Sequence, residues 1–384
     1  MKALLLTDTY PTEGNPNAGI FLKRRVDAIR AHGVDIEIGV PKFIFENRRF
    51  APFRKDEFAR EGISGIRYRF KVPHTGLTSL PAQLVAFARE RKVDVIAVHF
   101  GWNAPAAFKA RLKGGPPYIA YCHGSDVHTI PFQDEGYRRR LIPALEGAAA
   151  AIFVSSALLE TARGLGYSGN NALVIPNGYD PEVFHPGPAE DAGESVVFAG
   201  NLRPVKRPLL LPAVFRRIKE LRPGANFLIA GEGPLEAELH EALSEAKLAG
   251  CSRIMGALPQ SALAGAFRSA RVLMLPSANE GWPCVVKEAQ ACGLAVVGSD
   301  NGGIREAIGS GGRAVEDGPD ATEELAQAAA SFLDGSGRGA ALEAARGYSW
   351  SATTEREIAA LQGAAADLTR SPRPSKHCGM RNRS

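Results

Sequence analysis

Two glutamates in the C-terminal half, Glu280 and Glu288, are the residues best suited to chemistry on a charged ligand. The apolar run at 271–276 predicts a buried strand, and Pro283 before an alanine-rich stretch predicts a helix start. Glu288 would then lie about 7 Å along the helix axis, near the length of a diphosphate. One carboxylate could bind sugar hydroxyls and the other ribose hydroxyls, while free N–H groups of the first helical turn face the phosphates. The pattern favours a nucleotide-sugar site, although two glutamates alone would also fit a solvated helix face.

Further elements surround these glutamates in a fixed order: Pro-Ser at 276–277, then Gly281, Trp282 and Pro283, and a Gly-Gly pair at 302–303. In this order they resemble the Glu-x7-Glu region and the following Gly-Gly loop of family 4 retaining glycosyltransferases. The resemblance extends over about residues 1–363. It implies a GT-B fold, in which two Rossmann-like domains face each other across a cleft. It also implies that residues 280–283 and Glu288 bind the donor.

Apolar runs alternate with helical patterns in two sets, from residue 3 to 154 and from 195 to 298. This alternation predicts two doubly wound α/β domains with parallel sheets. A Pro/Gly-rich stretch at 185–194 places the boundary so that the domains cover 1–187 and 188–347. Residues 348–363 predict a capped helix that, by the resemblance, crosses back to the N-terminal domain. Ligands of such sheets bind at the carboxyl ends of strands, so we expect the active site in the interdomain cleft.

A cationic turn is expected after the strand that ends near Gly200, and it would neutralise a leaving diphosphate. A solvated loop is the alternative. The family usually has Gly-Arg-Leu and then a Lys-Gly pair. Lys206 matches that lysine, whereas Asn201 takes the place of the arginine and Arg207 that of the glycine. We therefore expect Arg203 to supply the missing charge, with Gly200 and Asn201 also lining the donor site.

Three shorter motifs complete the predicted site. His123 and Asp126 resemble the His-Gly-x-Asp element that faces the donor sugar in the family, and a structural histidine is the alternative. Asp126 is expected to order its loop or to contact the acceptor. Gly19, in a long turn after the first strand, would let backbone N–H groups approach phosphate, unless it merely tightens the turn. Gly231 and Gly233 form a second close-approach loop, near the nucleotide by resemblance.

Composition excludes several other classes of protein. The 384-residue chain is 45% hydrophobic and 23% charged, which is typical of a soluble globular protein. Its five cysteines form no C-x-x-C pair and indicate neither a disulfide framework nor a zinc site. No apolar run is long enough for a signal peptide or membrane span, so we expect a cytoplasmic protein. No Asp-x-Asp occurs, which disfavours a metal-bridged GT-A mechanism, and we expect no metal and no cofactor.

Two segments carry excess positive charge. The net charge of +5 equals the five cations of residues 370–384, which contain no acid and predict a disordered basic tail. No recognised nucleic-acid module accompanies this tail, so no nucleic acid is expected as a partner. Residues 42–71 hold nine cations interleaved with seven aromatic residues. They could contact the anionic inner face of a membrane or a lipid-linked acceptor, and an ordinary insertion with inward aromatics is the alternative.

The resemblance implies transfer of a sugar from a UDP- or GDP-sugar to a hydroxyl acceptor with retention, in the synthesis of polysaccharide, glycolipid or glycoconjugate. Lys206, Arg203 and helix-terminal amides would stabilise the leaving group, and Glu280 and His123 complete the expected catalytic set. No side-chain nucleophile is evident. The leaving phosphate is hypothesised to help deprotonate the acceptor. An NDP-sugar epimerase, a phosphorylase on the same fold, and a non-catalytic sugar-binding protein are the alternatives.

Overall fold

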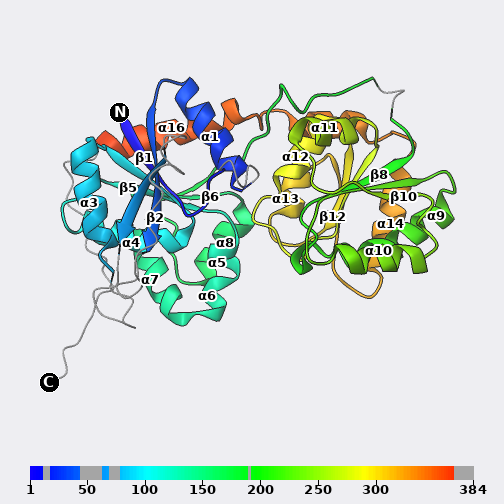
Figure 1. Ribbon diagram of the computed structural model, residues 1–384, viewed down its shortest axis with the longest axis horizontal. Helices are drawn as coiled ribbons and strands as arrows, with labels where there is room; N and C mark the ends of the chain where they lie inside the picture. The colour runs from blue at the N-terminus through cyan, green and yellow to red at the C-terminus, as the bar shows by residue number, and fades with distance from the viewer. Residues whose placement is uncertain (12–17, 44–62, 69–77, 189–191, 367–384) are drawn as a thin grey trace, which may run out of the picture. The chain divides into compact units, whose positions relative to one another are not determined.

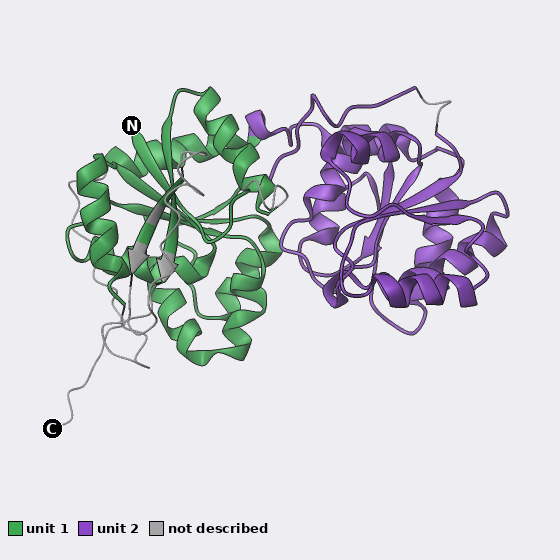
Figure 2. Ribbon diagram, in the orientation of Figure 1, with its two compact units in different colours: residues 1–176, 353–384 green, residues 177–352 purple. Residues whose placement is uncertain are grey.

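The computed structural model describes residues 1–11, 18–43, 63–68, 78–188 and 192–366 of the chain. The chain divides into two compact units, which Figure 2 shows in different colours. Unit 1 comprises residues 1–176 and 353–384, and unit 2 comprises residues 177–352. Each unit contains one parallel β-sheet, so each is a Rossmann-like fold in its own right.

Unit 1 is built on a seven-stranded sheet in the order β3-β2-β1-β4-β5-β6-β7, with helices around it (Figure 1). The strands β4 and β5 are buried along their whole length, as expected where helices cover both faces of a parallel sheet. The strands are β1 (Lys2–Leu6), β2 (Asp35–Phe43), β3 (Ile63–Tyr68), β4 (Val95–His99), β5 (Tyr118–Cys122), β6 (Ala150–Phe153) and β7 (Ala172–Val174). The helices are α1 (Ile20–Ala31), α3 (Leu80–Arg91), α4 (Ala104–Arg111), α5 (Ser125–His128), α6 (Ile130–Gln133), α7 (Glu135–Glu146) and α8 (Ser156–Gly164), with the 3₁₀ turn η1 (Gly101–Asn103).

Unit 2 is built on a six-stranded sheet in the order β10-β9-β8-β11-β12-β13. The strands are β8 (Ser195–Ala199), β9 (Asn226–Ala230), β10 (Ser252–Ile254), β11 (Val272–Leu275), β12 (Ala295–Ser299) and β13 (Gly312–Val315). The helices are α9 (Leu211–Leu221), α10 (Glu236–Glu245), α11 (Gln260–Arg268), α12 (Cys284–Ala291), α13 (Ile304–Ile308), α14 (Ala321–Phe332) and α15 (Arg338–Ala345), with the 3₁₀ turns η3 (Pro204–Lys206) and η4 (Pro208–Leu210). Because every ladder is parallel, the loops that follow the strands meet at one edge of the sheet.

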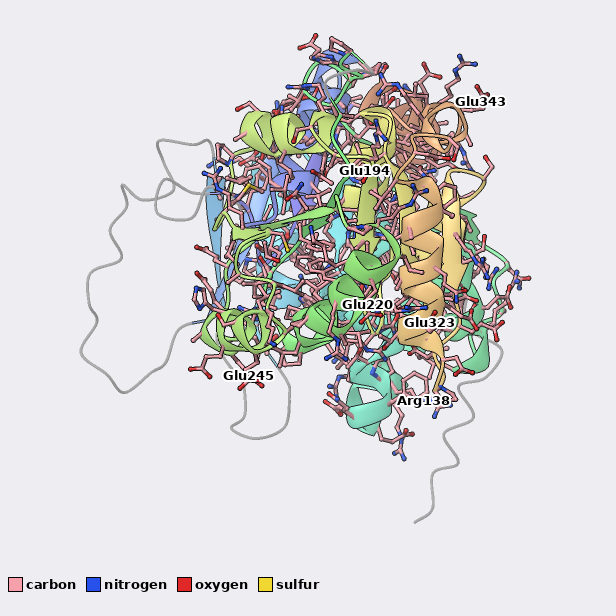
Figure 3. The ribbon with its side chains drawn as sticks, turned by 90° about the vertical axis from the view of Figure 1, so that its right-hand side faces the viewer. Arg138, Glu194, Glu220, Glu245, Glu323 and Glu343 are labelled. Atoms are coloured by element: carbon pink, nitrogen blue, oxygen red, sulfur yellow. The ribbon has the colours of Figure 1, made fainter. Side chains whose placement is uncertain are left out.

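The helices of unit 2 pack in two groups. Helix α9 contacts α10 and α14, whereas α12 contacts α11, α13 and α15. Apolar packing holds the first group to the sheet, with Phe215 of α9 stacked on Phe227 of β9 at 4.2 Å between ring centroids. At the surface, Arg217 of α9 donates to both carboxylate oxygens of Glu323 on α14, at 2.7 and 2.9 Å. Figure 3 labels Glu323. The second group carries α12, the helix of the predicted donor site.

The division between the units falls at Pro176 rather than at the predicted residue 187. Backbone pairing explains the difference: Tyr179 N donates to Tyr348 O at 2.9 Å, and Trp350 N donates to Tyr179 O at 3.0 Å. These bonds attach the segment after Pro176 to the end of unit 2. The predicted helix at 348–363 is α16 (Trp350–Ala366). From Thr353 onward it belongs to unit 1, where its apolar side packs on the sheet.

Several expectations concern residues outside the described ranges. The predicted tail at 370–384 lies wholly there, and so do 44–62 and 69–71 of the basic aromatic segment. Their suggested disorder and membrane contact stay predictions. Within the described ranges, no helix combines the length and apolar character needed to cross a bilayer.

Candidate functional site

The carboxyl ends of β8 and β11 bring Lys206 and Glu280 together in unit 2. These strands are neighbours, so the turn η3 after β8 lies beside the loop after β11. Ala278 N donates to Val205 O at 2.8 Å and joins the two loops. Lys206 Nζ donates to Glu280 Oε1, and the side chains are 22% and 14% exposed. The structure therefore combines two of the predicted catalytic residues into one partly accessible ion pair at the edge where such sheets bind ligands.

The Gly-Gly loop at 302–303 holds Glu280 in place through the backbone. Gly303 N donates to Glu280 O at 2.8 Å. Gly302 has φ 61°, and a Cβ there would lie 2.3 Å from Glu280 O. Any other residue would therefore push the glutamate loop away, in addition to straining the backbone. This explains why the two motifs recognised in the sequence occur together.

Trp282 and Pro283 support the loop rather than project from it. The Trp282 indole N–H donates to Asn177 O at 3.1 Å, and its ring stacks on Tyr348 at 5.6 Å. The side chain is buried. Pro283 was predicted at the first helical position, but α12 begins at Cys284 with Pro283 as its N-cap, where ψ is 99°. Its ring fixes φ while ψ stays extended, which ends the loop and starts the helix.

Helix α12 places Glu288 one turn beyond its start, on the same helix as a buried lysine. Lys287 Nζ donates to Ala344 O at 2.6 Å and to Gln290 Oε1 at 3.0 Å, and it lies 4.2 Å from the Tyr348 ring centroid. Burial lowers the pKa of Lys287 to about 8. Lys287 thus fastens α12 to the last turn of α15 and to Tyr348 just after it. Sequence reasoning missed this role, although its neighbours at 286 and 290 mark the inward side of the helix.

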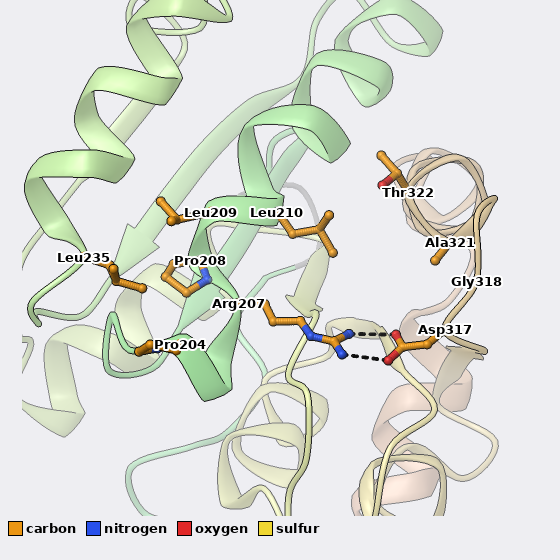
Figure 4. Close-up of a pocket in the computed structure, with 10 residues that line it drawn as sticks. All are labelled: Pro204, Arg207, Pro208, Leu209, Leu210, Leu235, Asp317, Gly318, Ala321 and Thr322. Carbon is orange, nitrogen blue, oxygen red and sulfur yellow. Dashed lines mark hydrogen bonds and ion pairs between the residues drawn. The ribbon is translucent and has the colours of Figure 1, made fainter.

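The cationic turn contains two arginines: Arg207 is bonded to an aspartate, whereas the Arg203 side chain is exposed. Arg207 Nη1 and Nη2 donate to Asp317 at 2.7 and 2.8 Å, as Figure 4 shows. Asn301 Nδ2 also donates to Asp317, at 3.0 Å, and the hydrogen bond from Arg207 is the main cause that lowers the pKa of this aspartate. Arg203 is exposed and has no side-chain partner among the described residues. This arrangement favours Arg203 over Arg207 as the cation for a phosphate.

The backbone at Arg207 explains the departure from the family pattern. Its φ of 49° and ψ of 47° lie in the left-handed region, where glycine is the residue that fits without cost. An arginine there costs about 1 kcal/mol. The bidentate bond to Asp317 offsets that cost and holds the turn without glycine.

A cavity of about 770 Å³ lies on the Arg207 side of this turn (Figure 4). Its walls are mainly apolar, and it contains neither Glu280 nor Glu288. We therefore do not assign the nucleotide to it. Its lining residues are Pro204, Arg207, Pro208, Leu209, Leu210, Leu235, Asp317, Gly318, Ala321 and Thr322.

The glycines at 231 and 233 are required by the packing of the chain on itself. Gly231 has φ 151°, and a Cβ there would lie 1.9 Å from Gly200 O. Gly233 has φ 159°, and its Cβ would lie 2.5 Å from Leu202 O. The loops after β8 and β9 therefore touch through their backbones, and Asn201 stays exposed between them. We predicted that these glycines let the backbone approach a nucleotide closely. The structure gives another reason for them, which is the contact between the two loops of this chain.

In unit 1, Asp126 orders the loops that follow β4 and β5. Its carboxylate accepts from Gly101 N and Gly124 N, both at 2.7 Å, and from His123 N at 3.1 Å. The residue is fully buried, and burial raises its pKa against the opposing effect of these bonds. Of the two predicted roles, this geometry supports loop ordering.

His123 lies among aromatic rings at the end of β5. Phe21 and Phe100 are 5.2 and 4.8 Å from it between ring centroids, and His99 Nδ1 lies 3.0 Å from His123 Nε2. Burial, followed by the charge of Arg25, lowers the pKa of His123, so the ring is neutral. His99 was missed in the sequence, although it ends β4 as His123 follows β5. Phe100 has φ 67° and ψ 127°, an unfavourable conformation of the kind that clusters at functional sites.

Gly19 is the N-cap of α1, with φ 66°. Its carbonyl accepts from Leu22 N at 2.8 Å, and a Cβ would lie 3.1 Å from Thr9 O. The glycine therefore permits a left-handed turn against the first strand's loop. Phosphate contact at this position stays a prediction, because residues 12–17 lie outside the described ranges.

The comparisons with known proteins agree with this architecture. Residues 181–346 match the family described as glycosyl transferases group 1, and residues 26–183 match glycosyltransferase family 4. The chain is 30% identical to the D-inositol 3-phosphate glycosyltransferase of Mycobacteroides abscessus, covering 81% of this chain and 78% of that one. This chain is a GT-B glycosyltransferase of family 4.

Another relative and a solved structure match nearly the whole length of this transferase. The D-inositol 3-phosphate glycosyltransferase of Actinosynnema mirum is 29% identical and matches 96% of this chain and 98% of that protein. Among solved structures, Anabaena Alr3699/HepE in complex with UDP superposes with a TM-score of 0.75 at 18% identity, covering 94% of this chain and 100% of that one. This structural likeness shows the shared fold.

Proposed function

We propose that this family 4 transferase moves a sugar from a nucleoside-diphosphate sugar to a hydroxyl acceptor, with retention at the anomeric carbon. The observation that carries the proposal is the Lys206–Glu280 pair at the sheet edge, with Glu288 one turn into the adjacent helix. The cation and the two carboxylates suit a diphosphate, a sugar and a ribose. The UDP complex of the Anabaena protein makes UDP the first nucleotide to test.

The reaction breaks the bond between the anomeric carbon and the diphosphate oxygen. Lys206 and Arg203 stabilise the developing phosphate charge, and Glu280 binds sugar hydroxyls. The acceptor oxygen forms the new bond on the same face, and its proton passes to the leaving phosphate. His123, held neutral in unit 1, contacts the sugar as the resemblance implies. No metal or cofactor takes part in this scheme.

A donor panel tests this function. Purified enzyme is incubated with UDP-, GDP- and ADP-sugars, and initial products are followed by proton NMR. We expect one nucleotide to be released, with the first sugar product in the same anomeric configuration as the donor. Inversion would contradict retention. Conversion of the donor sugar without nucleotide release would indicate an epimerase, and dependence on inorganic phosphate would indicate a phosphorylase.

The acceptor can be approached through the relatives. Two of them are D-inositol 3-phosphate glycosyltransferases, so this phosphate is the first acceptor to add. We also propose that the enzyme is cytoplasmic, works in glycoconjugate synthesis and contacts the inner membrane face through residues 42–71. Sedimentation with vesicles tests this contact, and equal binding to neutral and anionic lipid would contradict it.

A further inference from the structure

Two histidines share one hydrogen bond at the ends of neighbouring strands in unit 1. His99 ends β4, His123 follows β5, and His99 Nδ1 lies 3.0 Å from His123 Nε2. Their rings are within 17° of parallel, with centroids 5.2 Å apart. Asp126 fixes the loop on which His123 sits by accepting its backbone N–H. The shared hydrogen bond, the ring stacking and the bond that Asp126 accepts from the His123 backbone therefore fix the two rings relative to each other.

The environment keeps both rings neutral. Tyr121 stacks on His99 at 4.2 Å, and Arg25 lies 5.3 Å from the Tyr121 ring centroid. Arg25 in turn pairs with Glu357 on α16, at 2.8 Å. Burial and the positive charges nearby lower the pKa of both histidines. Each neutral imidazole has one N–H, so the shared bond uses one proton and leaves one for an outer nitrogen.

The two outer nitrogens are not equivalent. His99 Nε2 and His123 Nδ1 are both buried and have no hydrogen-bond partner among the described residues. His99 is fully buried, whereas His123 is partly exposed. An orphaned buried N–H is rarer in proteins than an under-used acceptor. The remaining proton is therefore placed on His123 Nδ1: this atom is itself buried, but the His123 side chain, unlike that of His99, is partly exposed, so a movement of the ring or its neighbours would let an incoming ligand accept the proton.

We propose that His99 is a positioning residue: its Nδ1–H donates to His123 Nε2, fixes His123 as the Nδ1–H tautomer, and leaves that N–H for a donor-sugar hydroxyl to accept. The second part rests on the proposed function. The first part is a property of the protein alone. It accounts for one buried and one partly exposed histidine, their shared bond and an N–H without a partner in the described chain.

Ring ¹⁵N NMR of histidine-labelled enzyme tests the tautomer without any substrate. The His99→Phe and His123→Phe variants assign the two rings among the eight histidines. We expect wild-type His123 to carry its proton on Nδ1, and the His99→Phe variant to lose this preference. Protonation of His123 on Nε2 in the wild type would overturn the proposal. If His123→Phe does not fold, His123→Gln supplies the assignment instead, and the wild-type spectrum then decides the tautomer.

Kinetics test the consequence. His99→Phe keeps a ring on Tyr121 but loses the donor, so kcat for nucleotide-sugar turnover should fall about tenfold with little change in KM. His99→Asn places an amide near the Nδ1 position and should restore most of that loss. His240→Phe, an exposed histidine on α10, is the matched control and should be unaffected. Equal losses in His99→Asn and His99→Phe would contradict a hydrogen-bonding role.

Failure of the function and failure of the inference are distinguishable. A wild-type enzyme that turns over no nucleotide sugar would refute the proposed function, and the NMR spectrum would still decide the tautomer. Full activity together with an Nε2–H tautomer on His123 would refute the inference alone.

Discussion

The two units differ in how far their ion pairs are buried: the pair in unit 1 is almost fully buried, whereas the pair in unit 2 is partly exposed. In unit 1, Arg25 and Glu357 are 1% and 2% exposed, and the histidines beyond them are kept neutral. In unit 2, Lys206 pairs with Glu280, and both remain partly accessible. An exposed ion pair is worth little and can exchange a partner, whereas a buried pair is locked into the fold. Unit 2 is thus suited to receive an anion, and unit 1 to hold a neutral hydrogen-bonding group.

Breaking the buried pair should have the largest effect on stability. Arg25→Met leaves the Glu357 carboxylate buried without its partner, and we expect a loss of about 3–5 kcal/mol in the free energy of unfolding. Urea unfolding of both proteins measures this loss. Arg217→Met breaks the surface pair with Glu323 and is the control, with a much smaller expected loss because the pair is exposed to solvent. Similar losses in the two variants would remove the contrast between the units.

Removing the phosphate-facing cation should have the largest effect on catalysis that spares the fold. We expect Lys206→Ala to lower kcat by about 10²–10³-fold, because the leaving diphosphate loses its positioned charge. Arg203→Ala should cost about tenfold. Initial rates with saturating donor measure both.

Arg207→Ala is the matched control in the same turn. Its guanidinium is bonded to Asp317, so we expect little change in kcat and a modest loss of stability. Unchanged kinetics in Arg203→Ala, with a large loss in Arg207→Ala, would reverse the assignment of the two arginines.

The buried lysine of unit 2 should make stability depend on pH. Burial lowers the Lys287 pKa from 10.5 to about 8, so between these values the unfolded chain binds more protons than the folded one. Wild-type stability should therefore gain up to about 3 kcal/mol from Lys287 as pH rises from 8 to 10.5, with the penalty fully present below pH 8. Bonds from Lys287 to Gln290 and Ala344 reduce this penalty.

The Lys287→Met variant isolates that contribution. The free energy of unfolding of each protein is measured with urea across this pH range. The difference, wild type minus variant, should rise with pH, because the contributions of all other titrating groups are the same in both proteins and cancel. A difference that is flat with pH would show that Lys287 keeps its ordinary pKa in the fold.

Metal removal should have the smallest effect. Lys206, Arg203 and the first amides of α12 meet the diphosphate charge in our scheme, so EDTA should leave the transfer rate within about twofold. Loss of activity in EDTA, with recovery on adding Mg²⁺, would contradict it.

Regular elements with apolar runs were predictable from the sequence. Strand β11 lies within the predicted run at 271–276, and β8 ends just before Gly200 as expected, because both strands are buried and each run ends at turn residues. The strand β13, Gly312–Val315, was missed because its short segment has no apolar run. Helix α9 begins at Leu211, since Pro212 suits the first turn and η4 takes up the preceding residues.

Pairings distant in the sequence were the part that could not be predicted. The motifs identified Glu280, Lys206 and His123 individually. No spacing rule joins Arg25 to Glu357 or Arg207 to Asp317, because the topology of the sheets brings them together. The backbone reason for Gly231 likewise depends on a neighbouring loop. The sequence therefore indicated which residues could do chemistry, whereas the side chains that pair with them and their orientation could be seen only in the fold.

The claim that unit 2 binds a nucleoside diphosphate through Glu288 is tested most directly by calorimetric titration with UDP, GDP and ADP. Wild type, Glu288→Ala, Glu280→Ala and the surface control Glu245→Ala (Figure 3) are titrated alike. We predict that one nucleotide binds wild type with micromolar Kd, and that Glu288→Ala weakens it about tenfold or more. Glu280→Ala and Glu245→Ala should bind as wild type, because Glu280 acts on the sugar. No binding to wild type, or equal binding to Glu288→Ala, would contradict the account.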